Sequence, residues 1–462
     1  MGYSTRGRAR GGTRSGSGTV RIKQTTGRYG TGAAGARHEA MAAEAVTFPL
    51  VVGVVHWIIV QLSASLALRF GTARESSPPY KGTLGEPVPL EGLAHVLVEP
   101  LRMWDGLWYK LIAEQGYNGT ETQTAKAAFW PLFPWLMDGG SRLTGLSVEA
   151  AGYIIANLSF LGALMLLYRL VVEDFDRAVA RRTLWALALF PTAFFFSAVY
   201  TESLFLLLAV GALLAARLGN WWVAGVVGLL AALTRSYGVL LLIPFAVLLI
   251  QQYGFVPRRW LSNLNLLAAG LPALGPTLFA FHLRRAGREP DAFITVQEQW
   301  FRFSAAPWTT FRCAVSGCEV NLPAAGGNFS VRGAEWGWIG DLLGNPTLAT
   351  LTSLEFRDFV AGSDTLELVA TLLFIGLAIA GLRLLPLYQS AYLIPGLVIP
   401  LFGPSAVHPL MSMPRFGLTL FPLFIVLALL IRRPIFVVPV AIGSTLLLVL
   451  LTAQFSNWYW VS

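Results

Sequence analysis

Long apolar runs separated by short polar turns dominate the chain from residue 46 onward. A helix needs about 20 apolar residues to cross the hydrocarbon core of a bilayer. Read in this way, the sequence predicts eleven membrane helices, over 46–68, 150–171, 183–199, 204–216, 221–233, 237–252, 261–281, 364–382, 387–403, 416–431 and 434–452. We therefore expect an all-α polytopic membrane protein.

Arginines mark alternate turns between these runs. They are Arg177, Arg181, Arg182, Arg217, Arg258, Arg259, Arg383, Arg432 and Arg433. Because cytosolic loops are rich in positive charge, these turns are predicted to be cytosolic, which leaves the polar stretches of about 70–148 and 283–362 outside. The fourth and fifth helices, 204–216 and 221–233, are short for a bilayer. Since polar backbone at membrane depth needs protein or water around it, they favour a cavity entering from the external side.

Composition agrees with a membrane protein. The chain is 55% hydrophobic and 13% charged, whereas soluble domains carry about 25% charged residues. Part of the net charge of +9 lies in residues 1–44, which are rich in Gly, Ser, Thr and Arg and poor in large apolar residues. We expect this segment to be a disordered cytosolic tail whose arginines contact anionic lipid rather than nucleic acid. Residues 45–462 then form the membrane domain.

The chain has two cysteines, Cys313 and Cys318. Two cysteines are too few for a metal cluster or a disulfide framework. Both lie in the second external stretch, where conditions are oxidising, and the four residues between them allow a ring to close. We therefore predict a disulfide between them, with two free thiols as the alternative.

The stretch "RMWDGLWYKLIAEQGY", residues 102–117, places one aspartate among aromatic residues. Its apolar residues recur at helical spacing: Trp104, Leu107, Trp108, Leu111 and Ile112. This spacing predicts an amphipathic helix, and two tryptophans on the apolar face suit a helix lying in the membrane interface. The segment "AFWPLFP", residues 128–134, has the same interfacial character. Asp105 would then stand at the start of the helix, near the external water–lipid boundary, with a simple N-cap as the alternative role.

Further charged residues stand where charge is costly. Glu202 lies in the turn between the third and fourth predicted helices, Arg235 lies between two apolar segments, and Arg415 precedes another. The alternatives are a solvated turn for Glu202 and headgroup contacts for the arginines. Ionisable residues near the membrane mark functional sites. Because an arginine pair suits a phosphate and a carboxylate suits general-base activation of a hydroxyl, we infer a lipid-phosphate-linked substrate attacked by an alcohol. Nearby His408 is a further candidate, with a structural role as its alternative.

Five motifs follow one another in order: "WDGLWYKLIAEQGY", "AFWPLFPWL", "ALFPTAFFFSAVYTESLFLLLAVGALLAAR", "ALTRSYGVLLLIPF" and "MPRFGLTLFPLF". Together with the closing "NWYWVS", they resemble the PIG-V-like mannosyltransferases, relatives of GPI mannosyltransferase 2 with the GT-C membrane glycosyltransferase fold. The resemblance covers about residues 46–462. It implies a polyprenyl- or dolichyl-phosphate mannose donor and a catalytic acid in the first external loop, where Asp105 matches. Glu202 resembles the second acid of such folds.

The residues and the resemblance together give a mechanistic hypothesis. Asp105 accepts the proton of the acceptor hydroxyl, assisted by Glu202, and the configuration inverts to give an α-mannoside. Trp104, Arg235, His408 and Arg415 are the candidates for substrate binding, with the donor phosphate at Arg235 and Arg415. Because the arginines stabilise the leaving phosphate, no metal or other cofactor is expected.

Alternatives remain open at the level of the sequence. Another lipid-phosphate sugar, such as glucose or arabinose, would suit the same fold. A lipid-linked sugar transporter is disfavoured, because transporters show internal repeats and the two halves of this chain show none. We expect an integral membrane protein with an external site, either in a bacterial plasma membrane or, in a eukaryote, in the endoplasmic reticulum. The acceptor is a lipid or a glycan, and its linkage is left open.

Overall fold

The computed structural model describes residues 33–71, 88–118, 121–255, 264–334, 344, 347 and 364–461. The chain divides into two units, Met1–Glu44 and Ala45–Ser462. The tail up to residue 32, Arg258, Arg259 and parts of both long polar stretches lie outside the described residues.

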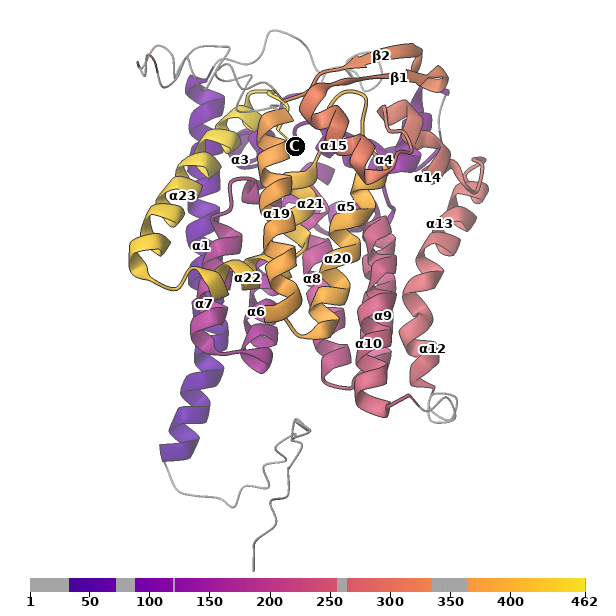
Figure 1. Ribbon diagram of the computed structural model, residues 1–462. Helices are drawn as coiled ribbons and strands as arrows, with labels where there is room; N and C mark the ends of the chain where they lie inside the picture. The colour runs from indigo at the N-terminus through magenta and orange to yellow at the C-terminus, as the bar shows by residue number, and fades with distance from the viewer. Residues whose placement is uncertain are drawn as a thin grey trace, which may run out of the picture. The chain divides into compact units, whose positions relative to one another are not determined.

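Helices make up nearly all of the regular structure (Figure 1). The α-helices are α1 (Ala33–Phe70), α3 (Gly92–Leu97), α4 (Asp105–Gln115), α5 (Leu132–Thr144), α6 (Val148–Asp174), α7 (Arg177–Ala188), α8 (Glu202–Arg217), α9 (Trp221–Thr234), α10 (Leu242–Tyr253), α12 (Asn265–Gly270), α13 (Leu274–Arg285), α14 (Ala292–Thr295), α15 (Pro307–Ser316), α19 (Asp364–Leu384), α20 (Leu387–Val398), α21 (Met413–Thr419), α22 (Pro422–Leu430) and α23 (Pro434–Ser456). Short 3-10 helices join them: η1 (Glu99–Leu101), η2 (Glu121–Ala128), η3 (Ala193–Phe196), η4 (Ser236–Leu241), η5 (Leu271–Ala273), η6 (Val296–Trp300), η7 (Pro323–Ala325) and η8 (Ile399–Phe402). The two described strands, β1 (Cys318–Leu322) and β2 (Gly327–Val331), pair antiparallel.

Each predicted apolar run contains helix, but several boundaries differ. Helix α1 begins at Ala33 rather than at residue 46, because the alanine-rich segment before the apolar run also favours helix. Helix α1 thus includes residues 33–44, the last part of the predicted tail, and residues 1–32 of that tail lie outside the described residues. The single helix expected over 416–431 is two helices, α21 and α22, bent by 87° at a break that Pro422 follows. A proline has no N–H to donate to the preceding turn, so a helix breaks there.

The expected number of eleven membrane helices is not confirmed. Six described helices are long and apolar enough to cross a membrane, or seven if α21 and α22 form one broken span. The predicted helices over 183–199, 204–216, 221–233 and 387–403 correspond to α7, α8, α9 and α20, which are all shorter than a full span. Helix α7 ends at Ala188 because Pro191 follows it.

One buried carboxylate ties three of the predicted cytosolic turns together. Asp174, the last residue of α6, accepts hydrogen bonds from Arg217 Nε (3.1 Å) and Gln389 Nε2 (2.8 Å). The hydroxyl of Tyr388 donates to the same carboxylate. These turns therefore lie at one end of the helices, as the arginine pattern predicts, while α4, α14, α15 and the strands lie at the opposite end (Figure 1).

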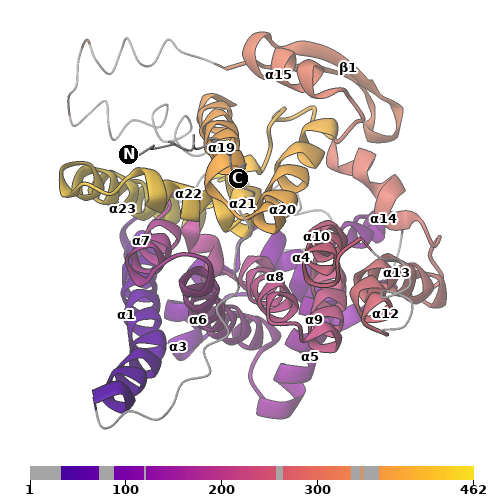
Figure 2. The same cartoon turned by 60° about the horizontal axis from the view of Figure 1, so that its bottom comes forward.

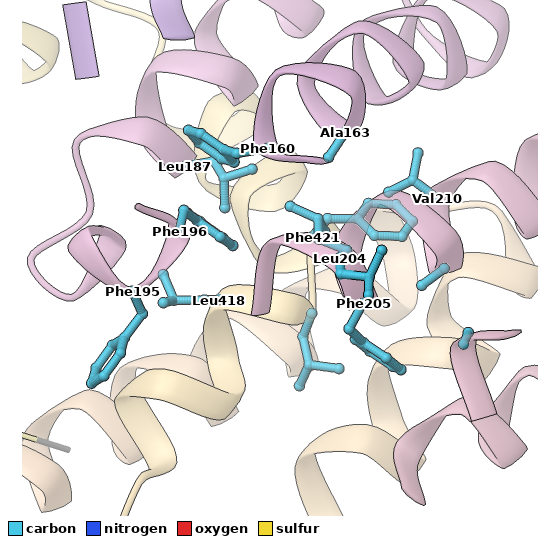
Figure 3. Close-up of a cluster of buried hydrophobic side chains, with 14 of the residues drawn as sticks. Phe160, Ala163, Leu187, Phe195, Phe196, Leu204, Phe205, Val210, Leu418 and Phe421 are labelled. Carbon is cyan, nitrogen blue, oxygen red and sulfur yellow. The ribbon is translucent and has the colours of Figure 1, made fainter. Parts of the chain in front are cut away.

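Helix α8, which begins at Glu202, is closely packed by its neighbours. Helix α8 packs against α6 and α9 (Figure 2), and a buried aromatic and aliphatic cluster fills the space around it (Figure 3). In this cluster the rings of Phe160 and Phe196 stack with centroids 4.4 Å apart. At the far end of α9, a Cβ on Gly238 would lie 2.2 Å from the backbone nitrogen of Ala232. Only glycine lets the chain fold back so tightly just after Arg235.

The predicted helix after Asp105 exists as α4, but its environment differs from the prediction. Trp104, Leu107, Trp108 and Ile112 are buried inside the protein rather than lying in the membrane interface. Trp108 stacks on Phe129, which belongs to the second segment predicted to be interfacial. An amphipathic pattern shows that one face is buried, and in this structure other parts of the chain bury it.

Candidate active site

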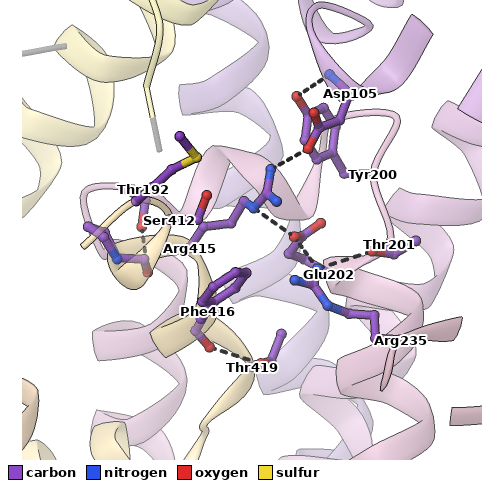
Figure 4. Close-up of polar contacts among 12 residues, drawn as sticks. Asp105, Thr192, Tyr200, Thr201, Glu202, Arg235, Ser412, Arg415, Phe416 and Thr419 are labelled. Carbon is purple, nitrogen blue, oxygen red and sulfur yellow. Dashed lines mark hydrogen bonds and ion pairs between the residues drawn. The ribbon is translucent and has the colours of Figure 1, made fainter. Parts of the chain in front are cut away.

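Four charged residues predicted from the sequence meet in one connected set of contacts (Figure 4). Arg415 Nη1 donates to Asp105 Oδ2 at 2.7 Å, and Arg415 Nε lies 3.3 Å from Glu202 Oε1. Arg235 Nη1 pairs with the same Glu202 oxygen and donates to Thr201 Oγ1 at 3.1 Å. Asp105 and Glu202 begin α4 and α8, Arg415 lies on α21, and Arg235 directly follows α9. The tertiary structure thus brings together four segments distant in sequence.

The burial of these residues excludes their simpler roles. The exposed fraction of Glu202 is 0%, so it is not a solvated turn residue, and its Oε2 atom has no hydrogen-bond partner within the described part of the chain. Arg235 pairs with this acid inside the protein instead of reaching headgroups. Trp104, not Asp105, occupies the N-cap position of α4, and the carboxylate of Asp105 is bound to Arg415.

Tyr200 fixes the backbone around Asp105. Its hydroxyl accepts a hydrogen bond from the Asp105 amide at 3.0 Å and donates to the Met103 carbonyl at 3.1 Å. Burial raises the pKa of this hydroxyl well above its ordinary value, so Tyr200 stays neutral and keeps both bonds. The Arg415 guanidinium lies 5.6 Å from the centre of the Tyr200 ring. Tyr200 therefore contacts both Asp105 and the arginine that binds the Asp105 carboxylate.

Trp104 has an unusual backbone conformation, and its side chain packs against residues near the C-terminus. Its φ angle is +58°, a left-handed value that a bulky residue rarely adopts. Its indole packs edge-on against the rings of Trp458 and Trp460, at centroid distances of 5.9 and 4.9 Å. On the other side, buried Arg102 donates to Glu149 Oε1 at 2.7 Å. The turn that presents Asp105 is therefore fixed from both sides, by residues that sequence reasoning did not single out.

A cavity of about 600 Å³ opens beside these groups. Asp105, Arg235 and Arg415 line it, together with nine aromatic residues: Tyr109, Phe129, Trp130, Tyr237, Phe293, Trp300, Phe303, Phe416 and Trp460. The cavity lies at the end of the short helices α8 and α9, as their length predicts. Neither Trp104 nor His408 is among the described residues that line it.

Sequence reasoning missed a third arginine of the cavity, Arg302. Its guanidinium lies 5.8 Å from the ring centre of Phe416, and those of Arg235 and Arg415 lie at 5.5 and 5.9 Å. Three guanidinium groups thus surround one aromatic ring at the cavity wall. The segment "QWFRF" could have indicated Arg302, because it places a lone charge among aromatic residues as the segment around Asp105 does.

His408 belongs to a different cluster. Its Nδ1 lies 3.1 Å from Asp364 Oδ1, and Glu367 is close enough that one ligand atom from each of the three residues falls within 4.8 Å of the others. Burial lowers the pKa of His408, but the hydrogen bond to Asp364 and the charge of Glu367 outweigh it, so that the pKa is raised above 6.5. The ion pair with Asp364 accounts for His408, and these three residues are also a set that could hold a cation.

Cys313 and Cys318 form a disulfide with an Sγ–Sγ distance of 2.11 Å. It joins the end of α15 to the start of β1, so the pairing predicted from the sequence is present in the structure.

The model of a protein family described as "Mannosyltransferase (PIG-V)" matches residues 42–257, a little under half of the chain. The matched range contains Asp105, Glu202 and Arg235. The resemblance seen in the sequence motifs is therefore confirmed over this range, and it supports a membrane glycosyltransferase. No curated protein gives a significant match.

Among solved structures, the chain is similar to the oligosaccharyltransferase of Archaeoglobus fulgidus in the apo form, with 15% identity and a TM-score of 0.40 over 88% of this chain and 55% of that one. It is also similar to ArnT from Cupriavidus metallidurans bound to undecaprenyl phosphate, with 15% identity and a TM-score of 0.38 over 89% of this chain and 77% of that one. The chain thus spans little more than half the length of the oligosaccharyltransferase. At these TM-scores the likenesses are distant.

Proposed function

We propose that the chain is a membrane glycosyltransferase that moves mannose from polyprenyl-phosphate mannose to a hydroxyl of a lipid or glycan acceptor. One observation carries the proposal: the buried carboxylate of Asp105 lies at a cavity that arginines also line. The family match supports mannose as the sugar. A cavity of about 600 Å³ is also of the size that small-molecule sites have, which is about 300–1,000 Å³.

Asp105 acts as the general base in this proposal. Arg415 occupies its Oδ2 atom, so the acceptor hydroxyl gives its proton to Oδ1. The acceptor oxygen forms a bond to the anomeric carbon while the bond from that carbon to the phosphate oxygen breaks. The phosphate leaves with the electron pair, and the configuration at the anomeric carbon inverts. A β-linked donor then yields an α-mannoside.

The arginines stabilise the leaving group. A sugar phosphodiester carries one negative charge, and the phosphate released from it carries up to two. Guanidinium groups held in place before the reaction stabilise this added charge without reorganisation. The donor therefore requires no divalent cation in this proposal.

The aromatic walls provide room for sugar rings. Trp130, Trp300 and Phe293 line the cavity beside polar Gln297. Flat apolar side chains with a few polar groups are typical of small-molecule sites. We place the sugars of donor and acceptor against these walls, and we place the site on the external face of the membrane, in agreement with the positions of the arginine-bearing turns.

Transfer of label from radiolabelled polyprenyl-phosphate mannose by the purified protein tests this function. Host lipids serve as acceptors, and the labelled product is identified by mass spectrometry. Asp105→Asn keeps the shape and removes the base, so we expect transfer to fall by about 10² to 10⁴. Asp138→Asn is the matched control, because Asp138 lies on α5 and pairs with exposed Arg142.

Two results would contradict the proposal. If Asp105→Asn turned over as fast as the wild type, Asp105 would not be the general base. Transfer of glucose or arabinose from the corresponding donors, with none of mannose, would keep the reaction class and change the sugar.

A further inference from the structure

The three arginines at the cavity differ in their partners. Arg415 is bound to Asp105 and Glu202, and Arg235 is bound to Glu202. Arg302 instead donates from Nη1 to the Gly403 carbonyl at 2.8 Å and from Nη2 to the Met411 carbonyl at 3.4 Å. Among the described residues, no carboxylate lies within ion-pairing distance of Arg302. Of the three cavity arginines, Arg302 is therefore the one without a carboxylate partner in the described part of the chain.

The backbone holds Arg302 firmly in this position. Arg302 forms a β-bridge with Ser405. On either side of it, the Phe303 amide donates to the Pro404 carbonyl at 3.0 Å, and the Ala406 amide donates to the Phe301 carbonyl at 2.7 Å. The two side-chain hydrogen bonds to carbonyls fix the guanidinium plane. A guanidinium has five N–H donors, so the donors that these bonds leave over remain available to a ligand in the cavity.

The charges around Phe416 point to an anion. Three guanidinium groups surround Phe416. Two of them are paired with Asp105 and Glu202, and Arg302 is not, although Glu298 also lines the cavity. A phosphodiester carries one negative charge, and its two non-bridging oxygen atoms match the donor fork of arginine. Burial lowers the pKa of Arg302 and outweighs the opposing effects of Tyr237, Glu367 and Asp105, while the charge of Arg415 also lowers it. A bound anion would favour the charged form of Arg302.

We propose that Arg302 binds the phosphate of the lipid-linked donor, while Arg235 and Arg415 mainly position the two carboxylates. This assignment rests on the proposed function and replaces the expectation that Arg235 and Arg415 are the main phosphate ligands. The reason is competition: an arginine already paired with a buried carboxylate gives up part of that pairing to bind a phosphate, whereas Arg302 gives up none.

Binding of undecaprenyl phosphate to the full-length protein in nanodiscs tests the assignment without requiring transfer. Arg302→Gln removes the charge, and we expect it to raise the dissociation constant at least tenfold. Arg302→Lys keeps the charge and loses the fork, so it should give an intermediate value. Arg312→Gln is the matched control, because Arg312 is an exposed arginine on neighbouring α15. Binding of undecaprenol, which lacks the phosphate, should be the same in all of these proteins.

Competition identifies the source of the phosphate. Inorganic phosphate and phosphatidylglycerol should displace undecaprenyl phosphate poorly. Displacement by either at equal concentration would overturn the assignment in favour of a general phosphate or headgroup site. A dissociation constant that Arg302→Gln leaves unchanged, or a wild-type protein that does not bind undecaprenyl phosphate, would also overturn it.

The outcome is separate from that of the transfer reaction. If the wild type binds undecaprenyl phosphate through Arg302 but transfers no mannose from the mannosylated donor, the proposed function fails and the phosphate site stands. If mannose is transferred and Arg302→Gln changes neither binding nor the KM for the donor, the function stands and Arg302 has no part in it.

Discussion

Arg415 Nη1 lies 2.7 Å from Asp105 Oδ2, although the two residues are 310 positions apart in the chain. The contact fixes one oxygen of the carboxylate and leaves the other for a substrate. It also places a positive charge beside the group that takes up the proton.

Replacing Arg415 should therefore change the chemical step more than donor binding. We expect Arg415→Gln to lower kcat by about 10² or more, since it releases the base from its position, and to change the KM for the donor by a smaller factor. Steady-state kinetics with varied donor measure the two effects. A large increase in KM with an unchanged kcat would instead make Arg415 a donor-binding residue.

Glu202 joins both arginines, and so its loss should affect stability as well as activity. Glu202→Gln leaves Arg235 without its carboxylate and brings two guanidinium groups together without the charge between them. Removing one member of a buried ion pair costs about 3–5 kcal/mol, so we expect a lower unfolding temperature in detergent and weaker transfer. Glu114→Gln, at an exposed pair with Lys110, is the control. An unchanged unfolding temperature and unchanged kinetics in Glu202→Gln would contradict the role of this residue.

The packing of Trp458 on Trp104 should matter for the position of Asp105. Trp458 does not line the cavity, so Trp458→Ala should lower kcat by about tenfold to hundredfold and leave both KM values nearly unchanged. Trp458→Phe keeps an aromatic contact and should restore most of the rate. Trp222→Ala, on the exposed face of α9, controls for loss of a tryptophan. Equal activity of Trp458→Ala and the wild type would show that the turn at Trp104 needs no such support.

The disulfide should be detectable without any substrate. Alkylation of the unreduced protein should label neither Cys313 nor Cys318, and alkylation after reduction should label both. Because the ring is short, replacing both by serine should cost no more than about 2 kcal/mol of stability. Mass spectrometry that finds both cysteines alkylated before reduction would exclude the bridge.

Chelation of divalent cations should leave transfer intact. The arginines carry the charge stabilisation in the proposed reaction, and the cluster of Asp364, Glu367 and His408 does not line the cavity. We expect activity after EDTA treatment to equal that before it. If EDTA abolished activity, and a divalent cation restored it in the wild type but not in Asp364→Asn, this cluster would instead be a functional cation site.

The sequence indicated the nature of the candidate site because charge in an apolar chain is costly and therefore conspicuous. Asp105, Glu202, Arg235 and Arg415 each stood alone among apolar or aromatic residues, and all four meet. Arg302 had the same signature and was missed, because it lies in a long polar stretch where a charge is not unusual. Trp104 and His408 were selected for their neighbourhood in sequence, and the structure assigns them to contacts outside the cavity.

The sequence by itself determined the helical class, the ends at which the turns lie, the disulfide pairing and the chemical character of the site. These properties follow from the run length of apolar residues, the charge of the turns and the spacing of two cysteines, which are all local. Only the tertiary structure decided which face of α4 is buried by protein rather than lipid, that α21 and α22 bend apart, and which cavity arginine has no acid partner among the described residues. These depend on residues far apart in the chain, since burial and ion pairing are set by whichever segments pack together.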